Sequence, residues 1–161
     1  MTYSITREEV LKWLDEVKDP EIPVLSIVDL GVITKIEIGE NKVEVEMTPT
    51  FVGCPALEIM KQEVVNVVRK HGVEHAVVTI SFKKPWSSDM ISEKGRVALK
   101  KFGLAPPPTG VINDIDLLEL AECPRCSGTN TEVRSPFGST LCRSIHYCLD
   151  CKESFEQFKP L

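Results

Sequence analysis

The residues with the clearest capacity for chemistry in this sequence are its six cysteines, which are unevenly distributed. Cys54 stands alone in residues 1–122, whereas the other five lie within the last 39 residues. Such a density is typical of disulfide-rich scaffolds and of small metal-binding domains. Disulfides do not persist in a reducing cytosol, where we expect this protein to be. The cysteine-rich end therefore predicts a metal site.

Four of these thiols form two C-x2-C pairs, Cys123 with Cys126 and Cys148 with Cys151, and 21 residues separate the pairs. Two such turns can hold one ion in a tetrahedron of thiolates. Strand-like runs at residues 131–134 and 145–147 would bring the pairs together. A segment this short, with few large apolar side chains, needs a bound metal or another cross-link to stay folded. We predict a zinc ribbon over residues 123–161, with iron or an iron–sulfur cluster as the alternative for four thiolates.

Two further residues of the ribbon, Cys142 and His146, could also bind a metal. In the simpler interpretation, Cys142 is a small buried hydrophobe and His146 is a surface residue on a strand. In the other, one of them replaces a cysteine ligand or binds a second, transient metal. The spacing leaves both interpretations open, so Cys142 stays an additional candidate ligand.

The lone thiol, Cys54, lies between Gly53 and Pro55 at the start of a segment whose apolar periodicity predicts a helix ending near Gly72. A cysteine at a helix N-terminus lies next to exposed backbone amides, which favour the thiolate and lower its pKa. Cys54 is therefore a candidate metal ligand or nucleophile. The alternative is that it is only a small residue next to the cap.

The elements that must position these thiols follow from hydrophobic periodicity and turn residues. A capping box at Thr6 and Glu9 predicts a first helix to about Val17. The other expected elements are a hairpin over residues 35–38 and 43–47, the helix from Pro55, a strand over 76–82 and a helix over 91–102. This order favours an α+β fold in which helices cover one face of a small mixed sheet, followed by the zinc ribbon. We expect an αβ domain over 1–104, a stiff Pro-rich and acidic linker over 105–122, and the ribbon over 123–161.

Composition excludes several classes of protein. The apolar content of 42% is too high for a disordered chain, and the net charge of −5 argues against sequence-blind binding to nucleic acid. No apolar run approaches the ~20 residues that span a bilayer. The first residues lack the basic-then-apolar layout of a signal peptide. We therefore expect a cytoplasmic protein that binds neither membrane nor nucleic acid.

Short motifs along the chain resemble two related families. Those of the first half resemble the small αβ family of iron–sulfur cluster assembly, which includes SufT-like proteins: residues 19–23, 26–31, 48–50 and 53–55. Those of the second half are similar to the PaaD family, the D subunits encoded with the phenylacetyl-CoA epoxidase of aerobic phenylacetate breakdown: residues 85–89, 103–107, 123–126, 137–142 and 148–159. The resemblance spans nearly the whole chain.

The resemblance implies maturation of iron centres rather than turnover by this chain. The expected partners are the epoxidase subunits, meaning the di-iron oxygenase, its iron–sulfur reductase, or both. Transient iron or an iron–sulfur cluster would be handled at Cys54. The chain has no Glu-x-x-His pair for a di-iron site and no Gly-x-Gly-x-x-Gly loop, so we expect a non-catalytic component. The alternatives are a structural subunit of the complex, a general iron–sulfur assembly factor, a zinc-ribbon nucleic-acid adaptor and a thiol enzyme.

Five polar residues in the same motifs are expected to support Cys54: Asp19, Glu21, Asp29, Thr48 and Thr50. The carboxylates could supply oxygen ligands to iron or orient the thiol, or they could simply form a turn and caps. The threonines could hydrogen-bond a thiolate or simply pair in the sheet. We expect Trp86 to lie in the core or on a partner surface rather than stacked on a cofactor.

Overall fold

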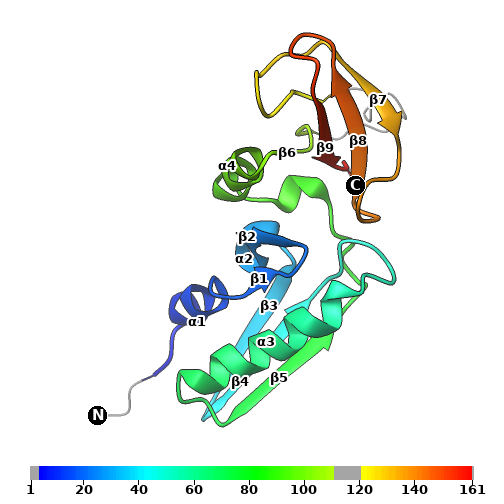
Figure 1. Ribbon diagram of the computed structural model, residues 1–161. Helices are drawn as coiled ribbons and strands as arrows, with labels where there is room; N and C mark the ends of the chain where they lie inside the picture. Colours follow the sequence, from blue (N-terminus) through cyan, green and yellow to red (C-terminus); the bar gives the residue numbers. More distant parts are fainter. Residues whose placement is uncertain (1–3, 111–120, 161) are drawn as a thin grey trace. The chain divides into compact units, whose positions relative to one another are not determined.

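The computed structural model describes residues 4–110 and 121–160 of the chain. It divides into two compact units, Met1–Trp86 and Ser87–Leu161, which can be followed by colour in Figure 1. In the described part of the chain, no helix combines the length and the hydropathy of a bilayer-spanning segment. Each unit is considered by itself below.

The first unit opens with helix α1 (Arg7–Leu14), which starts at the predicted capping box. The Glu9 amide donates to Thr6 Oγ1 at 3.3 Å, and the Thr6 amide donates to Glu9 Oε2 at 2.8 Å. The helix ends before Val17, whose amide bonds only three residues back to Leu14. Val17 is nevertheless buried with Val10 and Leu14, so the apolar face of the helix continues into the turn that follows it.

The sheet of the first unit has the strand order β3-β4-β5, with β3 (Ile33–Gly39), β4 (Lys42–Met47) and β5 (His75–Ile80). The predicted hairpin is confirmed, because β3 and β4 are antiparallel. Strand β4 alternates as expected, with Val43, Val45 and Met47 buried. Strand β5 runs parallel to β4, and a parallel pair requires a crossover between its strands.

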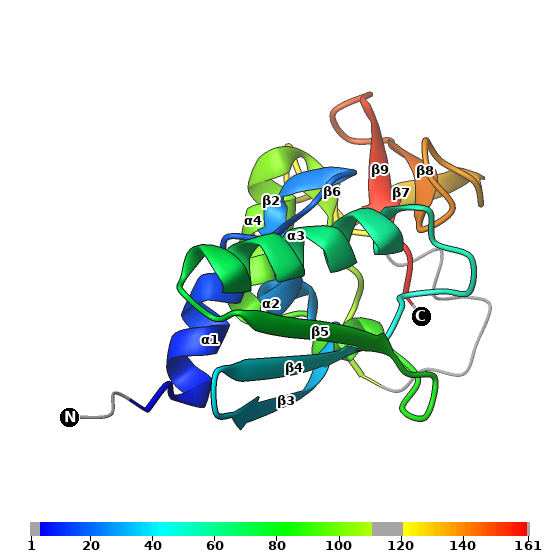
Figure 2. The same cartoon turned by 90° about the horizontal axis from the view of Figure 1, so that it is seen from below.

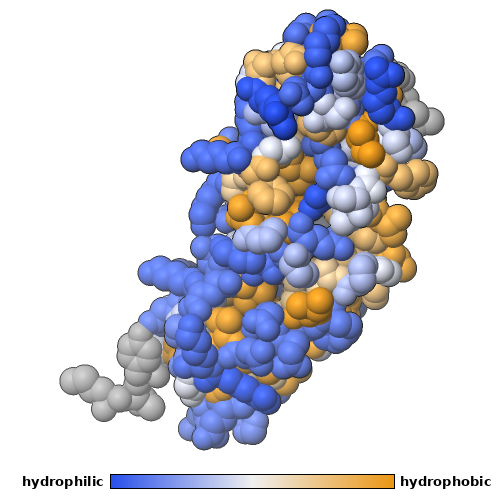
Figure 3. Space-filling view, in the orientation of Figure 1, coloured by the Kyte–Doolittle hydropathy of each residue, from blue (hydrophilic) through white to orange (hydrophobic). Residues whose placement is uncertain are grey.

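Helix α3 (Ala56–Lys70) is that crossover, and it ends before Gly72 at a φ of 90°. It buries Met60, Val64, Val67 and Val68. In Figure 2, α3 lies over one face of the sheet, and it contacts both β5 and α1. The space-filling view shows that the face carrying α3 is mostly hydrophilic, with apolar residues exposed at scattered positions (Figure 3). The buried apolar side chains of α3 hold the helix on the sheet, and its polar side chains face solvent.

Between α1 and β3 the chain forms three short elements that the sequence pattern did not predict. Strands β1 (Lys18–Asp19) and β2 (Ile22–Ser26) make an antiparallel ladder around Pro20, and α2 (Ile27–Leu30) follows. Gly31 ends α2 in the left-handed region at a φ of 77°. These elements are too short for a recognisable periodicity, because each spans five residues or fewer.

The second unit contains η1 (Ser88–Met90), α4 (Glu93–Phe102) and the sheet β6-β9-β8-β7. Its strands are β6 (Leu104–Ala105), β7 (Thr131–Ser135), β8 (Arg143–Cys148) and β9 (Ser154–Phe158). The predicted helix and the two predicted ribbon strands are confirmed. The sequence did not predict β9, which pairs antiparallel with β8 and parallel with β6.

The expected boundary after residue 104 differs from the observed division at Trp86/Ser87. Helix α4 contacts β6, and β6 extends the ribbon sheet, so both belong to the second unit. The Arg96 guanidinium is buried and donates to the carbonyl oxygens of Pro107 and Ser88. Residues 106–108 are thus held to α4 and are not a free spacer. Residues 111–120 of the expected linker lie outside the described residues.

Candidate metal centre and thiol site

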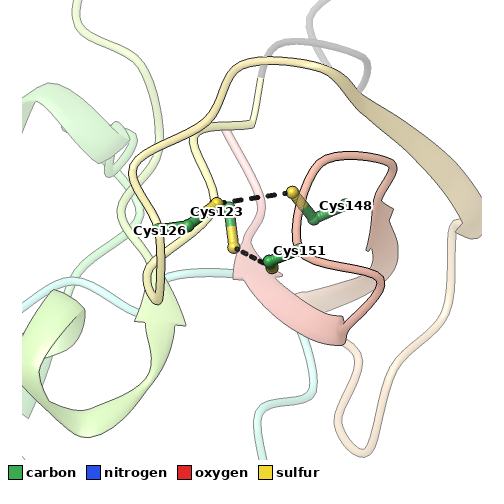
Figure 4. Close-up of side chains that lie close together, drawn as sticks. All are labelled: Cys123, Cys126, Cys148 and Cys151. Atoms are coloured by element: carbon green, nitrogen blue, oxygen red, sulfur yellow. Dashed lines mark hydrogen bonds between the residues drawn. The ribbon is translucent and has the colours of Figure 1, made fainter.

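The four paired cysteines of the second unit converge on one point. Their Sγ atoms all lie within 4.8 Å of one another, on turns that precede β7 and follow β8 (Figure 4). Cys123 Sγ lies 3.7 Å from Cys151 Sγ, and Cys126 Sγ lies 3.6 Å from Cys148 Sγ. A tetrahedral zinc site with Zn–S bonds of about 2.3 Å sets its sulfur atoms about 3.8 Å apart. The donor set therefore fits a four-thiolate metal ion.

The two C-x2-C turns share one backbone conformation. The amide four residues after the first cysteine donates to its carbonyl, at 2.9 Å from Ser127 to Cys123 and at 3.0 Å from Lys152 to Cys148. Ser127 and Lys152 also take the same left-handed conformation, with φ of 59° and 63°. Each turn thus presents two sulfurs on the same side and supplies two of the four ligands of a tetrahedral site.

Strand pairing brings the two turns together. Thr131 at the start of β7 is opposite Cys148 at the end of β8, and the Leu149 amide donates to the Asn130 carbonyl at 2.9 Å. The ligands also form the centre of the local core, a cluster of small and aromatic side chains: Ala105, Ala121, Cys123, Cys148 and Phe155, with Cys151 packed against them. A metal bound by the four thiolates would join the two turns inside this core.

Backbone amides set the charge that a metal would meet. Hydrogen bonds from the Cys151 and Asp150 amides lower the pKa of Cys148 to about 7. Burial has the opposite effect on Cys151, whose pKa it raises. A bound cation displaces the remaining thiol protons, because only the thiolates are ligands. Zinc held by Cys123, Cys126, Cys148 and Cys151 would serve structure, since all four positions are filled by protein.

Cys142 and His146 lie outside this group of four. Cys142 is buried, as the simpler interpretation predicted, and its sulfur lies 3.1 Å from Thr140 Oγ1. The expectation of a surface His146 is wrong, because its side chain is fully buried. Its Nε2 lies 2.8 Å from Ser144 Oγ, and its ring stacks on Phe155 at 5.5 Å between centroids. Strand β9 provides that cover, and the sequence pattern had not predicted β9.

In the first unit, Cys54 lies in the loop that joins β4 to α3. Gly53 has a φ of 84°, which turns the chain into the helix start. Pro55 is the N-cap, and the amides of Ala56 and Leu57 hydrogen-bond the Cys54 sulfur, as a position next to a helix N-terminus predicts. The loop thus places a half-buried thiol over the first turn of α3.

The predicted direction of the Cys54 pKa is wrong. Burial raises the pKa of the Cys54 thiol, and it outweighs the hydrogen bonds from the Ala56 and Leu57 amides that lower it. The carboxylates of Asp19 and Glu21 add to the rise by repelling the thiolate. The structure therefore brings Asp19 and Glu21 close enough to Cys54 to act on it, but it favours the protonated thiol.

The other polar candidates have local structural tasks. Asp19 Oδ1 accepts from the amides of Glu21 at 2.8 Å and Ile22 at 3.2 Å, which closes the β1–β2 turn. Asp29 and Ser26 cap α2, with the Asp29 amide donating to Ser26 Oγ at 3.0 Å. Buried Thr48 donates from Oγ1 to the Lys84 carbonyl at 3.0 Å. Asp19 and Asp29 thus stabilise a turn and a helix cap, and Thr48 ties the end of β4 to the segment after β5.

A pocket that the sequence analysis missed lies beside the same loop. It has a volume of about 270 Å³ and a mainly apolar lining: Thr48, Pro49, Thr50, Phe51, Val52, Phe82, Pro85 and Trp86. Trp86 is buried there and donates from Nε1 to the Leu30 carbonyl at 2.8 Å, so it is a core residue as expected. Phe51 and Val52 could have signalled this pocket, because two apolar residues are unusual in a loop between a strand and a helix.

Two family matches cover the chain in succession. Residues 7–82 match the family "Iron-sulfur cluster assembly protein", and residues 114–159 match the family "PaaD zinc beta ribbon domain". The first match falls within Met1–Trp86 and the second within Ser87–Leu161. The two families therefore follow the structural division of the molecule.

Known proteins are similar to the chain over nearly its whole length or over part of it. An Escherichia coli K12 protein, named as the D subunit of a "Putative 1,2-phenylacetyl-CoA epoxidase", is 34% identical over 94% of this chain and 91% of its own length. A Porphyromonas gingivalis protein named "Fe-S protein maturation auxiliary factor" is 35% identical over 58% of this chain and 90% of its own. A crystal structure of a domain of unknown function from Bacillus anthracis superimposes with a TM-score of 0.54 at 28% identity, covering 57% of this chain and 89% of that one.

Proposed function

The chain belongs to the PaaD family, and on that basis we propose that it is an accessory maturation factor for the iron centres of phenylacetyl-CoA 1,2-epoxidase in aerobic phenylacetate catabolism. One observation carries the proposal: an iron–sulfur assembly domain and a PaaD zinc ribbon occur in a single chain that matches the Escherichia coli relative almost from end to end. The iron–sulfur maturation names of other relatives support the same role.

In this proposal Cys54 is the working thiol and iron or an iron–sulfur cluster is its cargo. The thiol stays protonated while the site is empty, because burial, Asp19 and Glu21 oppose the thiolate. The same carboxylates attract a cation, and an arriving iron ion replaces the thiol proton, which leaves to solvent. Binding of the cargo therefore releases one proton, and its departure requires the thiol to take a proton up again.

The zinc ribbon serves as scaffold and contact surface in this proposal. Its four thiolates close a structural site, with no position left for a substrate. The clients would be the di-iron oxygenase subunit, the iron–sulfur reductase subunit, or both. Among the described residues, only the four ribbon cysteines cluster as metal ligands, so we infer that the chain's part in epoxidation is indirect.

The test is to replace Cys54 by Ser in cells that make the epoxidase. Serine retains a polar atom of similar size, so the fold and the ribbon zinc should be unchanged, and helix stability should change by less than about 1 kcal/mol. The epoxidase purified from these cells should be poor in iron and weakly active, as should the enzyme from cells that lack the chain. Cys142→Ser is the matched control and should leave iron content normal.

A second candidate function, a structural role within the complex, is favoured by the name of the Escherichia coli relative, which places that protein among the epoxidase subunits. The same experiment separates the two functions. Full iron occupancy in epoxidase from cells without the chain, with activity restored by adding the purified chain alone, would support the structural role and contradict maturation.

A further inference from the structure

The loop between β7 and β8 presents two large apolar side chains to solvent. Phe137 is 65% exposed and Leu141 is 61% exposed, although they lie only four positions apart. The loop can be followed between the two strands in Figure 1. It belongs to a motif that the sequence shares with the PaaD family, yet the metal site uses none of its residues. We call residues 137–141 the apolar loop.

Several hydrogen bonds fix the conformation of the apolar loop. The Gly138 amide donates to the Arg143 carbonyl at 2.8 Å, and the Arg143 amide donates to the Thr140 carbonyl at 3.2 Å. From β9, Glu156 accepts from the Ser139 amide at 2.6 Å and from Arg143 Nη1 at 3.0 Å. Arg143 is buried, so solvent screens this ion pair only weakly. The exposed side chains are therefore presented by a rigid support.

The apolar loop also requires glycine at its second position. A Cβ on Gly138 would lie 2.7 Å from Glu156 Oε1 and 2.9 Å from Arg143 Cβ. The second contact is close to the backbone of β8, so it cannot be relieved by turning a side-chain end. The backbone of the apolar loop thus packs tightly against Glu156 and Arg143, whereas the side chains of Phe137 and Leu141 remain outside the core.

Charge on the ribbon is uneven. Three arginines of the ribbon are paired with glutamates, and these pairs are Arg125 with Glu153, Arg134 with Glu132, and Arg143 with Glu156. Lys159 has no ion pair with another described residue, and its Nζ lies 4.9 Å from the centre of the Phe137 ring. The exposed Phe137 ring therefore carries on its face an ammonium group that no described carboxylate neutralises.

We propose that the apolar loop is the client-docking element of this protein: Phe137 and Leu141 insert into an apolar hollow whose rim carries carboxylates, on one of the epoxidase subunits. This inference rests on the function proposed above. Aromatic anchors that are rigid before binding lose little entropy on association, and they form the usual binding hot spots. Lys159 supplies the complementary charge for an acidic rim. Single-stranded nucleic acid fits less well, because it requires several unpaired cations, and three arginines here are neutralised.

The experiment compares the full chain with the double variant Phe137→Ser/Leu141→Ser. Binding to the purified oxygenase and reductase subunits of the epoxidase is measured by biolayer interferometry. The double variant should bind its client at least tenfold more weakly while retaining one zinc per chain and an unchanged melting temperature. Val97→Ala is the matched control, because Val97 is 46% exposed on α4 of the same unit. Lys159→Glu should weaken binding in low salt, and Lys159→Arg should restore it.

Two further measurements distinguish the failure of this inference from failure of the proposed function. If cells carrying Phe137→Ser/Leu141→Ser load the epoxidase with iron normally and the variant binds normally, the docking inference is overturned, while maturation stands. If the unmodified chain neither binds the epoxidase subunits nor affects iron loading, both fail. Binding of a 12-nucleotide oligo-dT that depends on Phe137, without binding to either epoxidase component, would also overturn the inference in favour of a nucleic-acid surface.

Discussion

Cys148 in the second unit lies where backbone amides converge, whereas Cys54 in the first unit lies beside two carboxylates. The amides of Cys151 and Asp150 lower the pKa of Cys148 to about 7, and burial with Asp19 and Glu21 raises the pKa of Cys54. Both sites contain a cysteine with amide hydrogen bonds, so the helix or turn alone does not decide its charge. Surrounding charge and burial therefore decide in which direction the pKa of each cysteine moves.

Removing one cysteine ligand of the second unit should have the largest effect, because it should unfold that unit and leave the first unit folded. Zinc binding contributes on the order of 10–16 kcal/mol in small domains of this kind. Cys148→Ser should therefore unfold the second unit, including α4 through β6, while the first unit keeps its fold. Two-dimensional NMR spectra of the full chain and measurement of bound zinc would show this. Cys142→Ser should keep both the zinc and the spectrum, and loss of zinc in this control would contradict the assignment of four ligands.

Each of the two cysteine sites has a neighbouring glycine, Gly128 beside the four cysteines and Gly53 beside Cys54, and replacing the two should affect zinc binding differently. A Cβ on Gly128 would lie 2.5 Å from Asp150 Oδ2 and 3.1 Å from Cys126 Sγ, so the carboxylate would have to turn away and the ligand sulfur would have to shift. Gly128→Ala should cost about 1–3 kcal/mol and weaken metal retention against a chelator. Gly53 has open space but a positive φ, so Gly53→Ala should cost about 1–2 kcal/mol and leave zinc retention unchanged. Urea unfolding with a zinc-release assay checks both, and equal zinc loss in the two variants would contradict this account.

The smallest expected effect tests the charge around Cys54. Glu21→Gln removes a negative charge that opposes the thiolate, so alkylation of Cys54 at pH 7.5 should become faster. The increase should be less than about fivefold, because a solvent-screened charge pair is worth at most about 1 kcal/mol. Mass spectrometry of the Cys54 peptide measures the rate. The control is Glu40→Gln at the β3–β4 turn, and a rate unchanged by Glu21→Gln would show that the Glu21 carboxylate does not act on the Cys54 thiol.

Much of the fold could be read from the sequence because it depends on neighbouring residues. The capping box at Thr6, the β3–β4 hairpin and the stops of α3 and α4 at Gly72 and Gly103 are all local patterns, and all are confirmed. The spacing of Cys123, Cys126, Cys148 and Cys151 likewise determined which thiols could share one ion, and the structure brings them together. Such features need only a short stretch of chain to be specified.

Tertiary structure alone decided the unit boundary, the burial of His146 and the direction in which the Cys54 pKa moves. The boundary depends on β6 pairing with β9, which lie about fifty residues apart in the chain. His146 is buried because β9 pairs with β8 beside it. The residues of β9 show no strong alternation of apolar and polar side chains, so the sequence did not predict this strand. Burial raises the pKa of Cys54, and Asp19 and Glu21, which the β1–β2 turn brings from more than thirty residues away, add to the rise. Burial and electrostatic fields are sums over residues distant in sequence, so a local pattern cannot give their sign.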